Sequence, residues 1–161
     1  MNYLQYQSPV GRLLLFSDGR ALKKVTFLSG VESETLVEHE SLADDVLKET
    51  CRQLDEWFAG ERQNFDLPLA PDGTDFQQQV WQELQKIPYG TTCSYGELAR
   101  QLGKPSASRA VGAANGQNPI ALIIPCHRVI GADGSLTGYA FGIERKKKLL
   151  TFEAQHQLQL L

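Results

Sequence analysis

A cysteine and a histidine stand side by side in the segment Ile124-Pro125-Cys126-His127-Arg128-Val129. The thiolate is the nucleophilic form of cysteine, and an unperturbed thiol is mostly protonated at neutral pH. A histidine within reach can take the thiol proton, directly or through one water, and so activate the sulfur. The pair therefore indicates a covalent nucleophile, although a buried thiol beside a structural histidine would give the same dipeptide.

A nucleophilic pair of this kind also needs a carboxylate, which fixes the histidine tautomer and favours the imidazolium. Asp133, Glu144 and Glu153 follow the pair along the chain, and their spacing does not choose among them. Adjacent side chains on a strand or a helix diverge, so a turn or a bridging water must connect Cys126 with His127.

The elements that must position this segment are expected to be mostly helical. Thr74 is a candidate N-cap with Gln77 as its capping-box partner, and Pro88-Tyr89-Gly90 ends the helix that they start. Two short helices, over 95–102 and 106–115, are joined by Gly103-Lys104-Pro105, which is the helix-turn-helix pattern. The second is rich in small residues, which suit a DNA groove and a tightly packed interior equally well, and Arg109 is its only long basic side chain.

The N-terminal half shows a different pattern. Residues 3–7, 11–17 and 21–28 are predicted to be strands, with Asp18-Gly19 as a hairpin turn. Residues 41–59 are apolar at helical spacing, with Ser41 as a candidate cap and Gly60 just past the end. The proline-containing stretch 67–73 is predicted to be a linker between two domains, 1–72 and 73–161.

Charge divides the chain in a similar way. Residues 1–84 hold 7 Lys/Arg and 15 Asp/Glu, whereas residues 85–161 hold 9 Lys/Arg and 4 Asp/Glu. The C-terminal half, with its net charge of +5, could therefore meet a polyanion that the N-terminal half would repel. Chance could equally produce such a split between two solvated surfaces.

Cysteine usage and hydropathy exclude several classes of protein. No long apolar run and no signal peptide occur, so a cytoplasmic protein without a membrane partner is expected. The three cysteines show no CxxC spacing, which argues against a disulfide framework and a zinc site. Cys51 and Cys93 are expected simply to pack.

The string PCHRVIG carries the strongest signal when it is taken together with the motifs around it. Tyr95-Gly96-Glu97-Leu98-Ala99, Arg109-Ala110-Val111-Gly112 and Asn118-Pro119 precede it, and Thr137-Gly138-Tyr139 and the pattern LLxxE at 149–153 follow it. Together these motifs resemble the O6-alkylguanine-DNA alkyltransferases (methylated-DNA–protein-cysteine methyltransferases), in their compact bacterial type. The match is dense from about Phe76 to Glu153 and weaker over residues 1–70.

The resemblance implies a fold and an activity. The fold is an α/β N-terminal domain, a small ribonuclease-H-like antiparallel sheet plus helix, followed by a mostly helical domain with a winged helix-turn-helix. The activity is suicidal DNA repair, in which double-stranded DNA is the partner and O6-alkylguanine, with O4-alkylthymine, is the lesion. The protein is expected to act as a monomer, without cofactor or metal, and to be spent after one transfer.

The resemblance also implies residue roles. Cys126 is the alkyl acceptor, His127 takes its proton through a water, and Glu153 orients and charges the histidine. Asn118 hydrogen-bonds near the thiolate, and Tyr95 donates a proton to the leaving base. Further expected contacts lie in the DNA interface and the base pocket: Arg109, which fills the gap left by the flipped nucleotide, Ala107, Ser108, Val129, Tyr139 and Ala140.

One departure from the family concerns the base pocket. The position two residues after Gly138, where members often carry a small hydroxyl residue, is Ala140, and the bulky Phe141 follows it. Backbone contacts to the base can survive this change, but the tolerated alkyl size is left open.

Three other functions are compatible with parts of the pattern. A lesion-binding module without chemistry would not need Cys126, and a cysteine hydrolase would not need the helix-turn-helix. An alkylation-sensing helix-turn-helix regulator usually dimerises, and no dimerisation element is visible.

Overall fold

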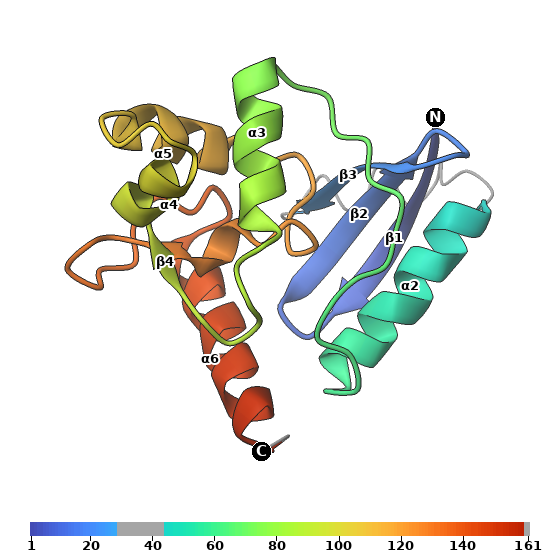
Figure 1. Ribbon diagram of the computed structural model, residues 1–161. Helices are drawn as coiled ribbons and strands as arrows, with labels where there is room; N and C mark the ends of the chain where they lie inside the picture. The colour runs from blue at the N-terminus through green and yellow to red at the C-terminus, as the bar shows by residue number, and fades with distance from the viewer. Residues whose placement is uncertain (29–43, 160–161) are drawn as a thin grey trace. The chain divides into compact units, whose positions relative to one another are not determined.

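The computed structural model describes residues 1–28 and 44–159, and the chain forms two compact units (Figure 1). The first unit contains residues 1–72 together with 119–123, and the second contains 73–118 together with the chain from residue 124 onward. The segment 119–123, which the sequence assigns to the second domain, therefore clusters with the first. No helix in the described ranges is long and apolar enough to cross a membrane.

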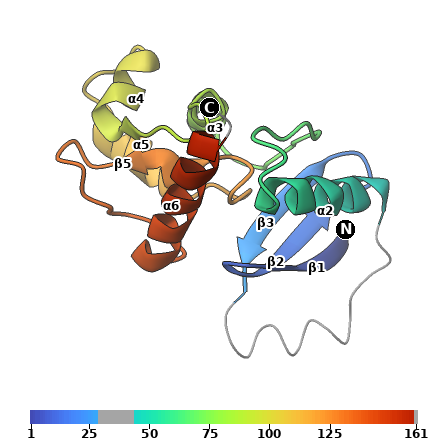
Figure 2. The ribbon, with the colours of Figure 1, turned by 90° about the horizontal axis from the view of Figure 1, so that it is seen from below.

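The first unit is built on an antiparallel sheet in the order β1-β2-β3, formed by Asn2–Ser8, Gly11–Ser17 and Leu22–Phe27. The Asp18 N–H closes the predicted turn on the Ala21 carbonyl at 3.2 Å. Helix α2, Asp45–Phe58, packs against β1 and β2 (Figures 1 and 2). These elements confirm the predicted small sheet with one helix.

Two details of the first unit differ from the expectation. Asp44 caps α2, because its carboxylate accepts the Leu47 N–H at 2.8 Å, while Ser41 lies outside the described residues. The predicted linker is an extended segment docked along β3: the Leu22 N–H donates to the Pro68 carbonyl at 2.7 Å, and the Ala70 N–H donates to the Leu22 carbonyl at 2.9 Å. Backbone pairing to the free edge of a strand gives this stretch a fixed place.

The segment 119–123 docks on β3 in the same manner. The Val25 N–H donates to the Pro119 carbonyl, and the Ala121 N–H donates to the Val25 carbonyl, both at 2.9 Å. The buried Leu122 that follows has a φ of +71°, a left-handed conformation that is unusual for a branched side chain. The chain thus reverses direction tightly, a few residues before Cys126.

The second unit is mostly helical, as predicted. Its long helices are α3 (Asp75–Leu84) and α6 (Ile143–Gln159), and the helix-turn-helix consists of α4 (Tyr95–Gln101) and α5 (Ser108–Gly116). Helix α5 begins two residues later than expected, because the Ala107 N–H closes a turn on the Lys104 carbonyl. The parallel pair β4 (Cys93–Ser94) and β5 (Val129–Ile130) brings the start of α4 next to the short 3-10 helix η1 (Cys126–Arg128).

The capping box at the start of α3 supplies a stability prediction. The Thr74 hydroxyl accepts the Gln77 N–H at 3.1 Å, and the Gln77 side-chain oxygen accepts the Thr74 N–H at 2.9 Å. Thr74→Ala is expected to lower the free energy of unfolding by about 1 kcal/mol, measured by urea denaturation. The exposed Thr92 offers a control, because Thr92→Ala should change the free energy of unfolding by less than about 0.5 kcal/mol. Equal effects of the two substitutions would contradict the assigned role of the cap.

Candidate active site

Cys126 begins the 3-10 helix η1, and its side chain is almost completely buried. Pro125, with φ −82° and ψ 62°, forms an inverse γ-turn in which the Cys126 N–H donates to the Ile124 carbonyl at 2.8 Å. The amide of Asn118 donates to the same carbonyl at 2.8 Å and also hydrogen-bonds the thiol. Two hydrogen bonds to the Ile124 carbonyl therefore fix the turn that leads into the cysteine.

His127, Arg128 and Glu153 form a buried network next to Cys126. The Nε2 atom of His127 lies 2.7 Å from Oε2 of Glu153, and both side chains are fully buried. The Arg128 guanidinium binds both oxygens of Glu153 at 2.9–3.2 Å and donates to the Ile87 carbonyl at 2.8 Å. The structure thus places Glu153 against His127, the residue that follows Cys126.

The other two candidate carboxylates lie elsewhere. Asp133 accepts the Ser135 N–H at 3.0 Å within an exposed turn, and Glu144 is exposed in the first turn of α6. Helical spacing explains the choice of Glu153, because it lies about two turns further along α6 than the buried Lys146 and on the same face.

The pKa shifts around Cys126 favour a neutral thiol and a neutral imidazole beside an ionised Glu153. Burial alone would raise the pKa of Glu153, but the contacts with His127 and Arg128 lower it to about 2. Burial lowers the pKa of His127 and outweighs the attraction of Glu153, so the imidazole is neutral at pH 7. Burial raises the pKa of the Cys126 thiol, against the opposing effects of Asn118 and Lys146.

Glu153 favours the imidazolium that His127 forms when it takes a proton, while burial keeps the resting imidazole neutral. An ionised Glu153 can only accept a hydrogen bond, so we assign the imidazole N–H to Nε2. Nδ1 of His127 has no hydrogen-bond partner among the described residues. A neutral imidazole with an open Nδ1 lone pair can act as a general base toward the neighbouring thiol.

Lys146 is a member of the site that sequence reasoning missed. Its side chain is fully buried, and Nζ donates to the Val129 carbonyl at 2.5 Å and to the Thr137 carbonyl at 2.9 Å. Its charge also lowers the pKa of Cys126. The signal was available, because in the basic run 145–148 Lys146 lies three residues before Leu149 and seven before Glu153, on the buried face of α6. Arg128 was missed too, although it belongs to the quoted motif.

Two tyrosines stand near the thiol. Tyr95, the first residue of α4, donates its hydroxyl to the Thr137 carbonyl at 3.1 Å. Tyr139 is buried, and its hydroxyl has no hydrogen-bond partner among the described residues. Burial raises the pKa of both phenols, and interaction with Cys126 contributes to each rise. Both therefore remain proton donors at neutral pH.

The loop that carries Tyr139 is tightly constrained. Gly138 has a φ of +70°, and a Cβ atom there would lie 3.1 Å from the Tyr95 hydroxyl, so a larger residue would be strained. The Gly142 N–H closes a turn on the Tyr139 carbonyl at 3.1 Å, which sets the Phe141 ring edge-on against the Tyr139 ring at 5.6 Å. Ala140 is exposed in this turn, and Val129 is buried beneath Lys146.

The predicted DNA-contacting residues lie at the start of α5, outside the hydrogen-bonded network around Cys126. Arg109 is exposed, and Ala107 and Ser108 are half-buried. The opposite face of α5 is buried through Val111, Ala114 and Asn115. The small residues of this helix therefore serve packing on one face and leave the other accessible.

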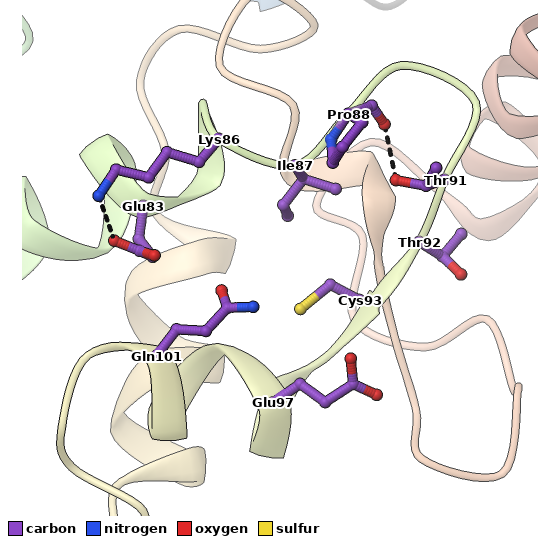
Figure 3. A pocket seen from close by; sticks show the side chains of 9 residues that line it. All are labelled: Glu83, Lys86, Ile87, Pro88, Thr91, Thr92, Cys93, Glu97 and Gln101. Carbon is purple, nitrogen blue, oxygen red and sulfur yellow. Dashed lines mark hydrogen bonds and ion pairs between the residues drawn. The ribbon is translucent and has the colours of Figure 1, made fainter.

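A separate pocket of about 210 Å³ contains a second thiol, that of Cys93 (Figure 3). Burial and the nearby Glu97 raise the pKa of this thiol, which disfavours its thiolate form at neutral pH. None of the residues predicted to act in catalysis lines the pocket. Within residues 1–28 and 44–159, no group of three or more His, Cys, Asp or Glu side chains could hold a metal ion.

Comparisons with known proteins agree over nearly the whole chain. The family model described as "6-O-methylguanine DNA methyltransferase, DNA binding domain" matches residues 75–155, and the one described as "6-O-methylguanine DNA methyltransferase, ribonuclease-like domain" matches residues 1–71. The chain is 50% identical to a Methanosarcina acetivorans protein named methylated-DNA–protein-cysteine methyltransferase, over 95% of this chain and 98% of that protein. A Mycobacterium tuberculosis protein of the same name is 48% identical, over 95% of this chain and 92% of its own length.

Solved structures show the same likeness. The crystal structure of Mycobacterium tuberculosis O6-methylguanine methyltransferase superposes with a TM-score of 0.84 at 48% identity, covering 96% of this chain and 93% of that one. A structure from the same organism described as being in complex with DNA gives a TM-score of 0.86 at 47% identity, covering 97% and 94%.

Proposed function

Because the chain belongs to the 6-O-methylguanine DNA methyltransferase family over both of its domains, we propose that it repairs O6-alkylguanine in double-stranded DNA by transferring the alkyl group to Cys126. O4-alkylthymine is a second lesion of the same chemistry. The observation that carries this proposal is the buried His127–Glu153 pair directly after Cys126, in which the imidazole is neutral and its Nδ1 lone pair is open.

The lesion must leave the base stack before it can react, because its alkyl group lies inside the duplex. Extruding a base costs roughly a few kcal/mol, and less where alkylation has already weakened the pair. Arg109, exposed on α5, can fill the vacated space and contact the partner base, while Ala107 and Ser108 allow that helix to approach the groove closely. Val129, Tyr139 and Ala140 then receive the base.

The transfer moves one alkyl group from the base to the sulfur, and its net proton transfer is from the thiol to the base, once His127 has returned a proton to Tyr95 by way of solvent. His127 accepts the thiol proton through a water, and the sulfur attacks the alkyl carbon in line. The bond between that carbon and the guanine oxygen breaks, and the base leaves with a negative charge that a proton from Tyr95 can neutralise. Asn118 and Lys146 stabilise the thiolate that forms on the way.

The product on the protein is a thioether at Cys126. A carbon–sulfur bond of this type resists hydrolysis under ordinary conditions, so one molecule repairs one lesion and is spent. This stoichiometry requires only a single copy of the chain, and we propose that it acts as a monomer.

Incubation of the protein with a duplex oligonucleotide that carries O6-methylguanine tests this function. Peptide mapping by mass spectrometry should locate a single added methyl group on Cys126, and the lesion should become guanine. Methylation at Cys51 or Cys93 instead, or binding without any transfer, would rule out the proposal, the latter in favour of lesion recognition without chemistry. More than one repaired lesion per protein molecule would exclude the suicide mechanism.

Arg109→Ala is expected to slow repair in duplex DNA roughly tenfold while the rate with free O6-methylguanine base stays the same. Removing the guanidinium withdraws the group that stabilises the flipped state but leaves the network around Cys126 intact. Single-turnover rates with the two substrates measure the effect. An equal loss on both substrates would contradict a role in base flipping.

A further inference from the structure

Asn115 is a buried polar residue that none of the steps above uses. It lies in the last turn of α5, and only 2% of its surface is exposed. Its Nδ2 donates to the main-chain carbonyl of Cys126 at 3.4 Å, while its Oδ1 has no hydrogen-bond partner among the described residues. A buried amide oxygen without a partner costs stability, and asparagine is also a poor helix former. An apolar residue would suit the helix better.

The bond to Cys126 is not needed to satisfy that carbonyl. The Cys126 carbonyl also accepts the N–H of Val129, which closes the 3-10 turn. What the Asn115 bond adds is a link between the main chain of the cysteine and the C-terminal end of α5.

Asn118, three residues further along, makes a matching contact. Its Nδ2 donates to the Ile124 carbonyl at 2.8 Å, and its own N–H donates to the Asn115 carbonyl at 3.3 Å. The two asparagines therefore hold carbonyls on either side of the Pro125 turn. Asn118 fixes the start of this turn, and Asn115 fixes the residue that carries the sulfur.

We propose that Asn115 is a positioning residue for the alkyl acceptor, which ties the main chain of Cys126 to the helix that carries Arg109. The inference rests on the proposed function, because α5 is the helix expected to contact the DNA. In-line attack requires the sulfur and the alkyl carbon to be aligned, and a misplacement of about 1 Å can cost on the order of a hundredfold in rate. A direct bond from α5 to Cys126 keeps the sulfur in register with a base that α5 helps to extrude.

Asn115→Leu tests this role, with Asn115→Ala as a second replacement that has a smaller side chain. With saturating duplex substrate, the maximal rate of methyl transfer should fall about tenfold. The Kd for the DNA should stay the same, and the Tm should be unchanged or higher because an unpartnered buried oxygen has been removed. A merely structural residue would instead lose stability and rate together.

Gln117→Leu is the control, because it also replaces a side-chain amide with leucine at the same helix end, but at an exposed position whose hydrogen bond goes to Gln77 and not to Cys126. It should leave the transfer rate unaltered. A wild-type rate in Asn115→Leu and Asn115→Ala would overturn the inference, and so would a loss of rate that follows a loss of Tm. If the wild-type protein itself transfers no methyl group to Cys126, the proposed function fails, which is a separate outcome.

Discussion

Replacing Glu153 with glutamine is expected to lower the free energy of unfolding by about 3–5 kcal/mol and to reduce alkyl transfer strongly. Glu153 is fully buried and is the shared partner of the Arg128 guanidinium and the His127 ring. Without the carboxylate, the buried charge of Arg128 is left uncompensated, which is the costly way to break a buried ion pair. The ring also loses a partner that can only accept: the glutamine amide can turn either its oxygen or its NH2 group toward Nε2, so the N–H is no longer held there and Nδ1 is no longer kept open for the thiol proton.

Acid unfolding provides an independent measurement of the same residue. The pKa of Glu153 is lowered to about 2 in the folded protein, from an ordinary value of 4.5. Its contribution to stability is therefore complete above pH 4.5 and is lost as the pH falls toward 2. The pKa of His127 is lowered as well, so the unfolded chain takes up its proton first and stability begins to fall below pH 6.5.

Urea denaturation as a function of pH should show these two losses in the wild-type protein. In Glu153→Gln the part that belongs to the carboxylate should be missing. Glu144→Gln is the control, because it removes an exposed carboxylate from the same helix and should change stability by less than about 0.5 kcal/mol. If the stability of Glu153→Gln depends on pH as that of the wild-type protein does, the Glu153 carboxylate is not a buried anion in the folded protein.

Local signals in the sequence predicted most of the fold. The Thr74–Gln77 capping box, the Asp18-Gly19 turn and the alternation of the first three strands each involve residues that are close in sequence, and the structure forms all three. The docking of 67–71 and 119–121 along β3 could not be predicted in this way, because it depends on backbone pairing between distant segments. The composition of residues 67–73 therefore predicted a linker, whereas most of this stretch forms part of the first unit.

Several features of the candidate active site could likewise not be predicted from the sequence. The family resemblance, through the pattern LLxxE, selected Glu153, whereas spacing alone did not. Lys146 stands in a run of basic residues that suggests a solvated surface, and only its three-dimensional neighbours reveal a buried ammonium. The pKa of His127 depends on burial, which the sequence does not show, and burial outweighs the opposing effect of the neighbouring carboxylate.

Replacing Lys146 with methionine is expected to slow methyl transfer at neutral pH by roughly ten- to hundredfold, the effect of losing about 1.5–3 kcal/mol of thiolate stabilisation. Methionine keeps the length and apolar stem of the lysine side chain but removes the charge that lowers the pKa of Cys126. It also removes the donor that joins the Val129 and Thr137 carbonyls across the loop in front of the thiol. Both losses act on the same step, the formation of a thiolate in a closed site.

The dependence of the rate on pH separates the effect of charge from that of packing. Since Lys146 lowers the thiol pKa, its loss should raise that pKa further, and the transfer rate of the variant should recover partly as the pH is increased. Single-turnover rates between about pH 6 and 10 measure this shift. Lys147→Met, which changes the exposed neighbouring lysine, should keep the wild-type profile. A uniform loss at every pH in Lys146→Met would mean that the residue acts only by holding the loop, because an electrostatic effect on the thiol must diminish as the solution itself removes the proton.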